Sequence, residues 1–203
     1  MKYFIFLLSL LISSLWSYSF KDSLAQGKPG DYIVTAQGKM YTVLLLREIS
    51  EESFTMEEIS VPETDIDLSK ISWKNWVEQG APLHTSWTAH EIDFKTNQIL
   101  ESYSYDYKAW LYANDAQNFL STLLSLPLTR TPEHKRKKIG PAPLNSEEDR
   151  RKTWQPPMVL EGKKKENTSL YAWNTKWPKD DSLISECEIE FYFGTFPFPY
   201  WIE

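Results

Sequence analysis

The three histidines are the side chains of this 203-residue chain best suited to acid–base or metal chemistry. His84 and His90 are close in sequence, Glu91 follows directly, and His134 stands apart. Two imidazoles and a carboxylate are a common ligand set for transition metals. However, the His-x5-His spacing crosses an expected loop-to-strand boundary and matches no zinc template. We therefore expect His84 in a loop and His90 on a strand face, with no metal and no cofactor.

Established catalytic motifs are absent from the sequence. It contains no nucleophile elbow, no phosphate-binding glycine loop and no zinc-protease motif. Asp65 and Asp67 lie on one side of an extended segment, where a solvated acidic loop is commoner than a catalytic pair. We expect a protein that is not an enzyme. The alternative is a hydrolase of unfamiliar type, which predicts a polar cleft that gathers His90, Glu91 and a loop carboxylate.

Aromatic side chains are more abundant than a modest core requires, at 15% of residues with nine tryptophans. Exposed aromatic side chains stack on sugars and anchor protein partners, although Trp and Tyr also pack well inside β-rich cores. On this basis we predict an aromatic binding surface, and its candidate residues are Trp73, Trp76, Trp87, Tyr103, Tyr105 and Tyr107. The three tyrosines share one face of an expected strand.

A basic, proline-rich excursion covers residues 130–165, with eleven Lys or Arg against five acidic residues. It is expected to be a long surface segment that is partly disordered. Its candidate basic patch is Lys135, Arg136, Lys137, Lys138, Arg150 and Arg151. Such a patch suits lipid head groups, a polyanionic glycan or an acidic protein, and the alternative is a solvated loop. The whole chain carries a net charge of −6, which argues against nucleic-acid binding.

The first nineteen residues predict export. One Lys precedes an apolar run over 3–16, and Ser17-Tyr18-Ser19 supplies a small-x-small cleavage pattern. The run is shorter than the ~20 residues that a transmembrane helix needs. We expect residues 1–19 to be a cleaved signal peptide, so that residues 20–203 form a periplasmic or secreted protein and not an integral membrane protein. Retention of the segment as an anchor is the alternative.

Hydrophobic periodicity predicts one β-rich domain over residues 20–203, beginning with a flexible lead at 20–30. Alternating apolar residues between turn signals predict an antiparallel meander and a hairpin, with strands over 32–36, 40–49, 53–61, 87–94 and 99–107. Ser72 and Gly80 bracket a short helix. Residues 114–126 form the best helix, whose apolar stripe is Ala116, Phe119, Leu120, Leu123 and Leu124. The expected fold class is α+β, mainly antiparallel sheet with one amphipathic helix packed on it.

The C-terminal part holds the only cysteine of the chain. Period-2 alternation over 183–193 predicts a strand on which Cys187 faces the core and Glu186, Glu188 and Glu190 face water. A reactive thiol or an intermolecular disulfide is the alternative. The strand-like segment 200–202 ends the sequence, so either it tucks into the sheet or the reading frame is shortened.

Four segments together resemble an uncharacterised family of exported proteins from chlamydia-like bacteria. They are residues 76–82 (WVEQGAP), 138–143 (KIGPAP), 177–182 (WPKDDS) and 198–202 (FPYWI). The resemblance implies an exported protein whose relatives continue past the last Tyr-Trp segment, which favours the shortened reading frame. It implies no activity and no site residues.

The sequence as a whole favours a non-enzymatic, exported envelope or periplasmic protein that binds a partner through aromatic surface. That partner is expected to be an envelope protein, a glycan or a lipid. A lipid- or glycan-binding module stays open as an alternative, and it predicts several tryptophans lining one concave surface.

Overall fold

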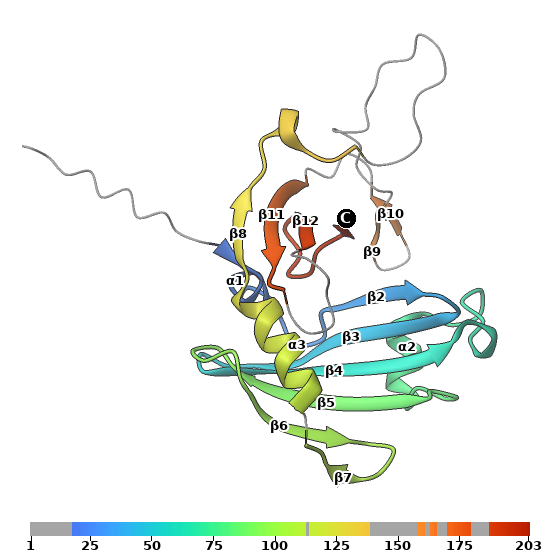
Figure 1. Cartoon of the computed structure of the whole chain (residues 1–203). Coiled ribbons are helices and arrows are strands. Elements are labelled where there is room, and N and C mark those ends of the chain that lie inside the picture. Colours follow the sequence, from blue (N-terminus) through green and yellow to red (C-terminus); the bar gives the residue numbers. More distant parts are fainter. Residues whose placement is uncertain (1–17, 113, 139–157, 161–162, 166–169, 180–186) are drawn as a thin grey trace, which may run out of the picture.

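Two antiparallel sheets with helices packed on them form most of the described part of the chain (Figure 1). The computed structural model describes residues 18–112, 114–138, 158–160, 163–165, 170–179 and 187–203. A six-stranded sheet forms one layer, and the C-terminal sheet lies beside one of its faces with two helices between them. The predicted fold class, α+β and mainly antiparallel, is therefore confirmed.

The large sheet is a meander in which each strand pairs with the next one along the chain. Its strands are β2 (Tyr32–Gln37), β3 (Met40–Ile49), β4 (Ser53–Pro62), β5 (Ser86–Asp93), β6 (Ile99–Ser104) and β7 (Ala109–Trp110). The turns follow from local residue chemistry. Gly38 has a φ of 61° and Asn97 a φ of 58°, and these two residue types tolerate the left-handed conformation that such turns require.

The second sheet collects segments that are distant in sequence. Its order is β1-β8-β11-β12-β13, formed by β1 (Tyr18–Ser19), β8 (Pro127–Arg130), β11 (Tyr171–Trp177), β12 (Cys187–Phe193) and β13 (Trp201–Ile202). A separate hairpin pairs β9 (Met158–Leu160) with β10 (Lys163–Lys165). The strand-like C-terminal segment, for which two readings were open, pairs with β12.

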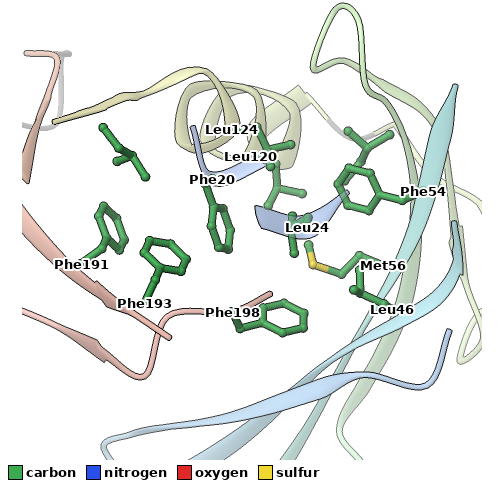
Figure 2. Close-up of a cluster of buried hydrophobic side chains, with 12 residues drawn as sticks. Phe20, Leu24, Leu46, Phe54, Met56, Leu120, Leu124, Phe191, Phe193 and Phe198 are labelled. Carbon is green, nitrogen blue, oxygen red and sulfur yellow. The ribbon is translucent and has the colours of Figure 1, made fainter. Parts of the chain in front are cut away.

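One hydrophobic core joins the two sheets, and Figure 2 shows its side chains pointing toward one another from both sheets and from the helices. The large sheet contributes Leu46, Phe54 and Met56, whereas Phe191 and Phe193 come from β12. Helices α1 (Phe20–Leu24) and α3 (Asn114–Ser125) fill the space between them. Leu120 and Leu124 bury the predicted stripe of α3, while the side chains of Ala116 and Phe119 lie outside the described part.

The opposite face of the large sheet has a core of its own. Helix α2 (Trp73–Glu78) follows the short 3-10 helix η1 (Glu63–Asp65) and packs Trp76 against Val43 and Ile59. The side chain of Ser72 accepts a hydrogen bond from the backbone N–H of Asn75, which makes Ser72 the predicted N-cap. Both faces of the sheet are therefore covered near β3 and β4.

The prediction of a flexible lead over residues 20–30 is wrong, because this segment contains α1. Ser19 caps the helix with Asp22 in a reciprocal capping box, and Phe20 and Leu24 are buried in the shared core. The segment is short and polar in composition, so its two apolar anchors gain their burial only from the tertiary packing.

The orientation predicted for β12 is wrong for two of its residues: Cys187 is exposed and Glu190 is 1% exposed. Glu188 is exposed and Phe191 is buried, as predicted. Both faces of β12 are covered near its end, by the shared core and by Leu170 and Ala172. An alternating pattern predicts that one face of a strand is exposed to solvent. This prediction does not hold where a strand is covered on both faces. Residues 183–186 of the predicted strand lie outside the described residues.

Within the described residues, no helix combines the length and the apolar character needed to cross a membrane. Of the predicted signal peptide, residues 1–17 lie outside the described part, while Tyr18 and Ser19 form β1. Within the basic excursion, the described residues include the 3-10 helix η2 (Glu133–Lys135). Arg150 and Arg151 lie outside them.

Candidate binding surface

Four aromatic side chains form a continuous row across β5, β6 and β7, which we call the aromatic ladder: Trp87, Tyr105, Tyr103 and Trp110. The ring centroids of Trp87 and Tyr105 are 4.8 Å apart, those of Tyr105 and Tyr103 5.3 Å, and those of Tyr103 and Trp110 5.2 Å. Trp110 is 68% exposed and Tyr105 41%. The row is thus a surface feature, and its rings hold one another in place.

Strand register brings the ladder together. Tyr103 pairs with Ala89 of β5 on one side and with Trp110 of β7 on the other. The backbone N–H of Tyr105 donates to the carbonyl oxygen of Trp87 at 3.0 Å, which extends the pairing past the end of β6. Alternation then places all four rings on the same face of the sheet.

Of the three tyrosines predicted to share a face, Tyr103 and Tyr105 contact each other and Tyr107 does not join them. The strand ends at Ser104, and Tyr107 lies 81% exposed in the turn before β7. The predicted strand to residue 107 is too long, because the chain reverses at Asp106 to build a further strand.

A buried carboxylate anchors one end of the ladder. Glu57 of β4 is 1% exposed, and it accepts hydrogen bonds from Trp87 Nε1 at 3.2 Å and from the hydroxyl of Tyr105 at 3.0 Å. Arg47 donates to both carboxylate oxygens, from Nε at 3.0 Å and from Nη2 at 2.6 Å. Four donors therefore compensate for the burial of this charge.

The hydrogen bonds to Glu57 also shift the pKa values of the groups around it. The hydrogen bond to Glu57 raises the pKa of Arg47 above its usual value. Burial raises the pKa of Tyr105, and the Glu57 carboxylate adds to this effect. The phenol therefore stays protonated and donates its proton to Glu57. Arg47 reaches the carboxylate because it is the extra residue of a β-bulge between Leu46 and Glu48.

His84 lies at the same end of the ladder. Its ring is 5.6 Å from that of Trp87 and perpendicular to it. Nδ1 is 2.7 Å from the carbonyl oxygen of Ala81, and Nε2 is 2.8 Å from Oδ1 of Asp106. Both ring nitrogens are thus engaged, and His84 acts as a strut between the loop before β5 and the turn after β6. It lies in a loop, as predicted.

The residues expected to form a hydrolytic cleft do not assemble. His90 is 5% exposed and bonds through Nδ1 to the hydroxyl of Ser102 at 2.7 Å. Glu91 follows it on β5 and points to the opposite face, where it accepts a hydrogen bond from the Ser53 hydroxyl. Among the described residues, no group of three or more His, Cys, Asp or Glu is placed to hold a metal ion.

The other predicted aromatic residues lie elsewhere. Trp76 is 2% exposed within the α2 core. Trp73 packs against it with ring centroids 5.6 Å apart, and Trp73 also contacts Tyr41. These two tryptophans fix α2 to the large sheet. Of the six predicted binding residues, the structure therefore brings Trp87, Tyr103 and Tyr105 together.

Two side chains in the described part of the basic patch form hydrogen bonds within the protein. Arg136 Nη2 donates to the carbonyl oxygen of Leu170 at 3.5 Å, and Lys137 Nζ donates to the carbonyl oxygens of Glu188 and Glu203, each at 3.3 Å. Lys135 and Lys138 are exposed. The side chains of Arg136 and Lys137 thus tie the start of the excursion to the second sheet.

Sequence reasoning missed Arg47, Glu57 and Trp110 as members of this surface. A signal for the first two existed, since Arg47 and Glu57 lie five residues on either side of the turn at residue 52. In an antiparallel hairpin such positions are near neighbours. No comparable signal indicated Trp110, because its place depends on a two-residue edge strand.

Comparison with known proteins identifies a family and a similar solved structure. The family model described as CT021 protein matches residues 42–166, a range that contains the whole ladder together with Arg47 and Glu57. The structure of the hypothetical protein CT021 from Chlamydia trachomatis is similar, with a TM-score of 0.64 and 23% sequence identity over 91% of this chain and 84% of that chain. At this identity the likeness shows the fold. No curated protein matches the chain.

Proposed function

This chain belongs to the CT021 protein family, and from its exposed aromatic ladder we propose that it is a non-enzymatic, exported protein that binds a protein partner. The observation that carries the proposal is the row of four contacting rings, anchored on Glu57 and Arg47 and open to solvent at Trp110. Trp, Tyr and Arg are the residues most enriched among those that dominate binding energy at protein interfaces.

The exposure of the ladder supports a binding role over plain core packing. Leu111 is 40% exposed and Tyr112 100% exposed, and both follow Trp110 directly. Contiguous apolar surface of this kind costs solvation free energy, and in soluble proteins it marks interaction sites. The hydrogen bonds that Trp87 and Tyr105 donate to Glu57 also hold two rings in place before binding, which reduces the entropy lost on association.

The ring geometry favours a protein partner over a glycan. A sugar stacks on the flat face of a ring, so a linear glycan suits several coplanar rings. Here Tyr103 is inclined 86° to Tyr105 and 68° to Trp110. The ladder thus presents ring edges and faces in alternation, a relief that suits the varied side chains of a protein surface.

The positions of the candidate catalytic groups support a non-enzymatic role. His84 has both ring nitrogens engaged, and His90 and Glu91 point to opposite faces of β5. Export is supported by the sequence pattern of residues 1–19.

The proposal is tested by selecting binders to the full chain from a displayed library of random peptides. Selected peptides are then measured by fluorescence anisotropy against the ladder variant, in which the ladder residue Trp110 and its exposed neighbour Tyr112 are both replaced (Trp110→Ser with Tyr112→Ser). Both side chains are more than half exposed, so the folded state tolerates the change. We expect the variant to lose at least about tenfold in affinity, which corresponds to ~1.4 kcal/mol.

A matched control replaces two exposed apolar side chains outside the ladder, Leu68→Ser with Ile202→Ser, which are 45% and 55% exposed. This control should bind the selected peptides as tightly as the unmodified chain. If the ladder variant also binds unchanged, or if the control loses as much affinity, the ladder is not the binding surface.

A further inference from the structure

We infer that the partner segment that the ladder binds is cationic and presents arginine or lysine side chains to it. This inference rests on the proposed function and adds the chemistry of the partner. It comes from two carboxylates on the ladder face and from the absence of a cation that neutralises them in the described part of the chain.

Glu91 and Glu101 form a like-charge pair beside the ladder. They are directly opposite each other in the register of β5 and β6, and Glu101 lies two residues from Tyr103, on the same face of the strand. Like charges at opposite positions of a sheet are destabilising. In the described part of the chain, neither carboxylate has a salt-bridge partner. An arriving cation would relieve this repulsion.

The other charges near the ladder do not offset this pair. The charge of Arg47 is taken up by Glu57 at 2.6 Å. Asp106 is itself a carboxylate. It accepts a hydrogen bond from the backbone N–H of Trp87, and its Oδ1 lies 2.8 Å from Nε2 of His84. Lys108 is exposed in the turn that leads to β7 and forms no salt bridge with either carboxylate in the described part of the chain. The face of the ladder therefore carries, beside Tyr103, two carboxylates that have no salt-bridge partner among the described residues.

Aromatic rings beside carboxylates form a recognised environment for guanidinium and ammonium groups. The ring quadrupole attracts the cation, and a carboxylate completes its hydrogen bonds. The chain itself uses the first of these contacts in its second sheet, where the guanidinium carbon of Arg130 lies 4.2 Å from the ring centroid of Tyr171. Trp110 and Tyr112 are both exposed, and no cation–π contact to either ring is found among the described residues. Their rings are therefore available to a cation of a partner.

The same charges argue against an anionic membrane as the occupant. Anionic head groups are attracted by lysine and arginine and repelled by carboxylates. The acidic pair and the exposed rings are thus consistent with a basic protein segment and not with a phospholipid surface.

The test uses a fluorescein-labelled peptide in which four arginines alternate with glycine and serine, measured by anisotropy at 0.15 M salt. The reference peptide carries citrulline, which is neutral and has nearly the same shape, in place of each arginine. We expect the arginine peptide to bind the full chain at least about tenfold more tightly than the citrulline peptide. The variant Glu91→Gln with Glu101→Gln should lose about three- to tenfold for the arginine peptide alone.

The matched control removes the same charge elsewhere, with Glu63→Gln and Glu133→Gln, both exposed. It should bind like the unmodified chain. Equal affinity for the two peptides, or an equal loss in the control, would overturn the inference. Ladder-dependent peptides of neutral or acidic composition would overturn it while leaving the proposed function intact. Sedimentation of a dimer that Glu91→Gln with Glu101→Gln dissociates would instead identify a second copy of the chain as the occupant.

Discussion

At the scale of single residues, Glu57 shows how this protein keeps a charge inside a β-sheet. Its carboxylate is buried, yet Arg47, Trp87 and Tyr105 all donate hydrogen bonds to it. The two charged partners are not equivalent, since the side chain of Arg47 is 46% exposed and that of Glu57 is 1% exposed. Water is therefore available to the guanidinium alone.

This asymmetry predicts an order of stabilities. Arg47→Met retains an apolar stem and leaves a buried carboxylate with two neutral donors, so it should lower the free energy of unfolding by about 3 kcal/mol or more. Glu57→Gln leaves a guanidinium that water can solvate, and it should cost about 1–3 kcal/mol. Urea denaturation of both variants measures the difference. Equal costs, or a larger cost for Glu57→Gln, would show that Glu57 is not held mainly by Arg47.

His90 is a second residue whose burial has a measurable consequence. Burial lowers its pKa below the usual 6.5, so the folded chain keeps the imidazole neutral while the unfolded chain protonates it. Unfolding then takes up a proton as the pH falls below about 6.5. The contribution is fully present above that value and is lost as the pH falls toward the folded pKa.

We accordingly expect the melting temperature of the chain to fall between pH 7.5 and pH 5.5, and to fall less in His90→Gln. The difference between the two proteins isolates His90 from carboxylates that titrate in both. His134→Gln, at an exposed position, serves as the control and should follow the unmodified chain. Parallel curves for His90→Gln and the unmodified chain would show that His90 binds its proton equally well in both states.

At the scale of elements, α1 owes its position to packing as much as to its cap. Gly27, three residues past its end, lies against the core because it has no side chain. A Cβ atom there would be 2.6 Å from Cδ1 of Leu46 and 3.0 Å from the carbonyl oxygen of Leu24. The turn after α1 is therefore built to contact β3 closely.

Gly27→Ala should lower the free energy of unfolding by about 1–3 kcal/mol through overpacking. Part of the conflict is with the flexible end of Leu46, so a smaller side chain there should relieve it. In a double-mutant cycle, Gly27→Ala should cost less in a Leu46→Val background than in the unmodified chain. Chemical denaturation of the four proteins gives the coupling energy. Additive costs would mean that the backbone contact with Leu24 dominates.

At the scale of the whole molecule, the two sheets share one core, and the N-terminal strand belongs to it. Tyr18 stacks on Trp173 with ring centroids 4.6 Å apart. Tyr18 and Ser19 pair with Leu128 and Pro127 of β8. Cleavage after Ser19, as the sequence pattern predicts, would remove β1 and the N-cap of α1. Cleavage before Tyr18 would keep both.

The two cleavage sites predict mature chains of different stability. A chain beginning at Tyr18 should be more stable than one beginning at Phe20, by at least about 1 kcal/mol, because it retains the cap and the aromatic stack. Thermal denaturation of both chains measures this difference, and mass spectrometry of the protein exported from cells gives the natural N-terminus. Equal melting temperatures would show that β1 contributes nothing to the fold. Tyr18→Ser in the full chain separates the loss of the stack from the loss of the cap.

The sequence by itself determined the elements whose signals are local. Strands β2 to β6 of the meander and helices α2 and α3 were predictable, because alternation, turn residues and caps act over a few neighbouring positions. The short edge strand β7 was not. Tyr103 and Tyr105 were predictable as neighbours for the same reason, since strand geometry places residues two apart on one face.

Only the tertiary structure decided which of these surfaces are buried and which side chains meet. Phe20, Leu24 and Glu190 are buried because both sheets and the C-terminal segment close around them, whereas Cys187, at the start of β12, stays exposed. Trp87 and Trp110 join the same ladder, although twenty-three positions separate them, through the register of three strands. Burial and register depend on contacts between distant segments, and no local pattern of residues contains that information.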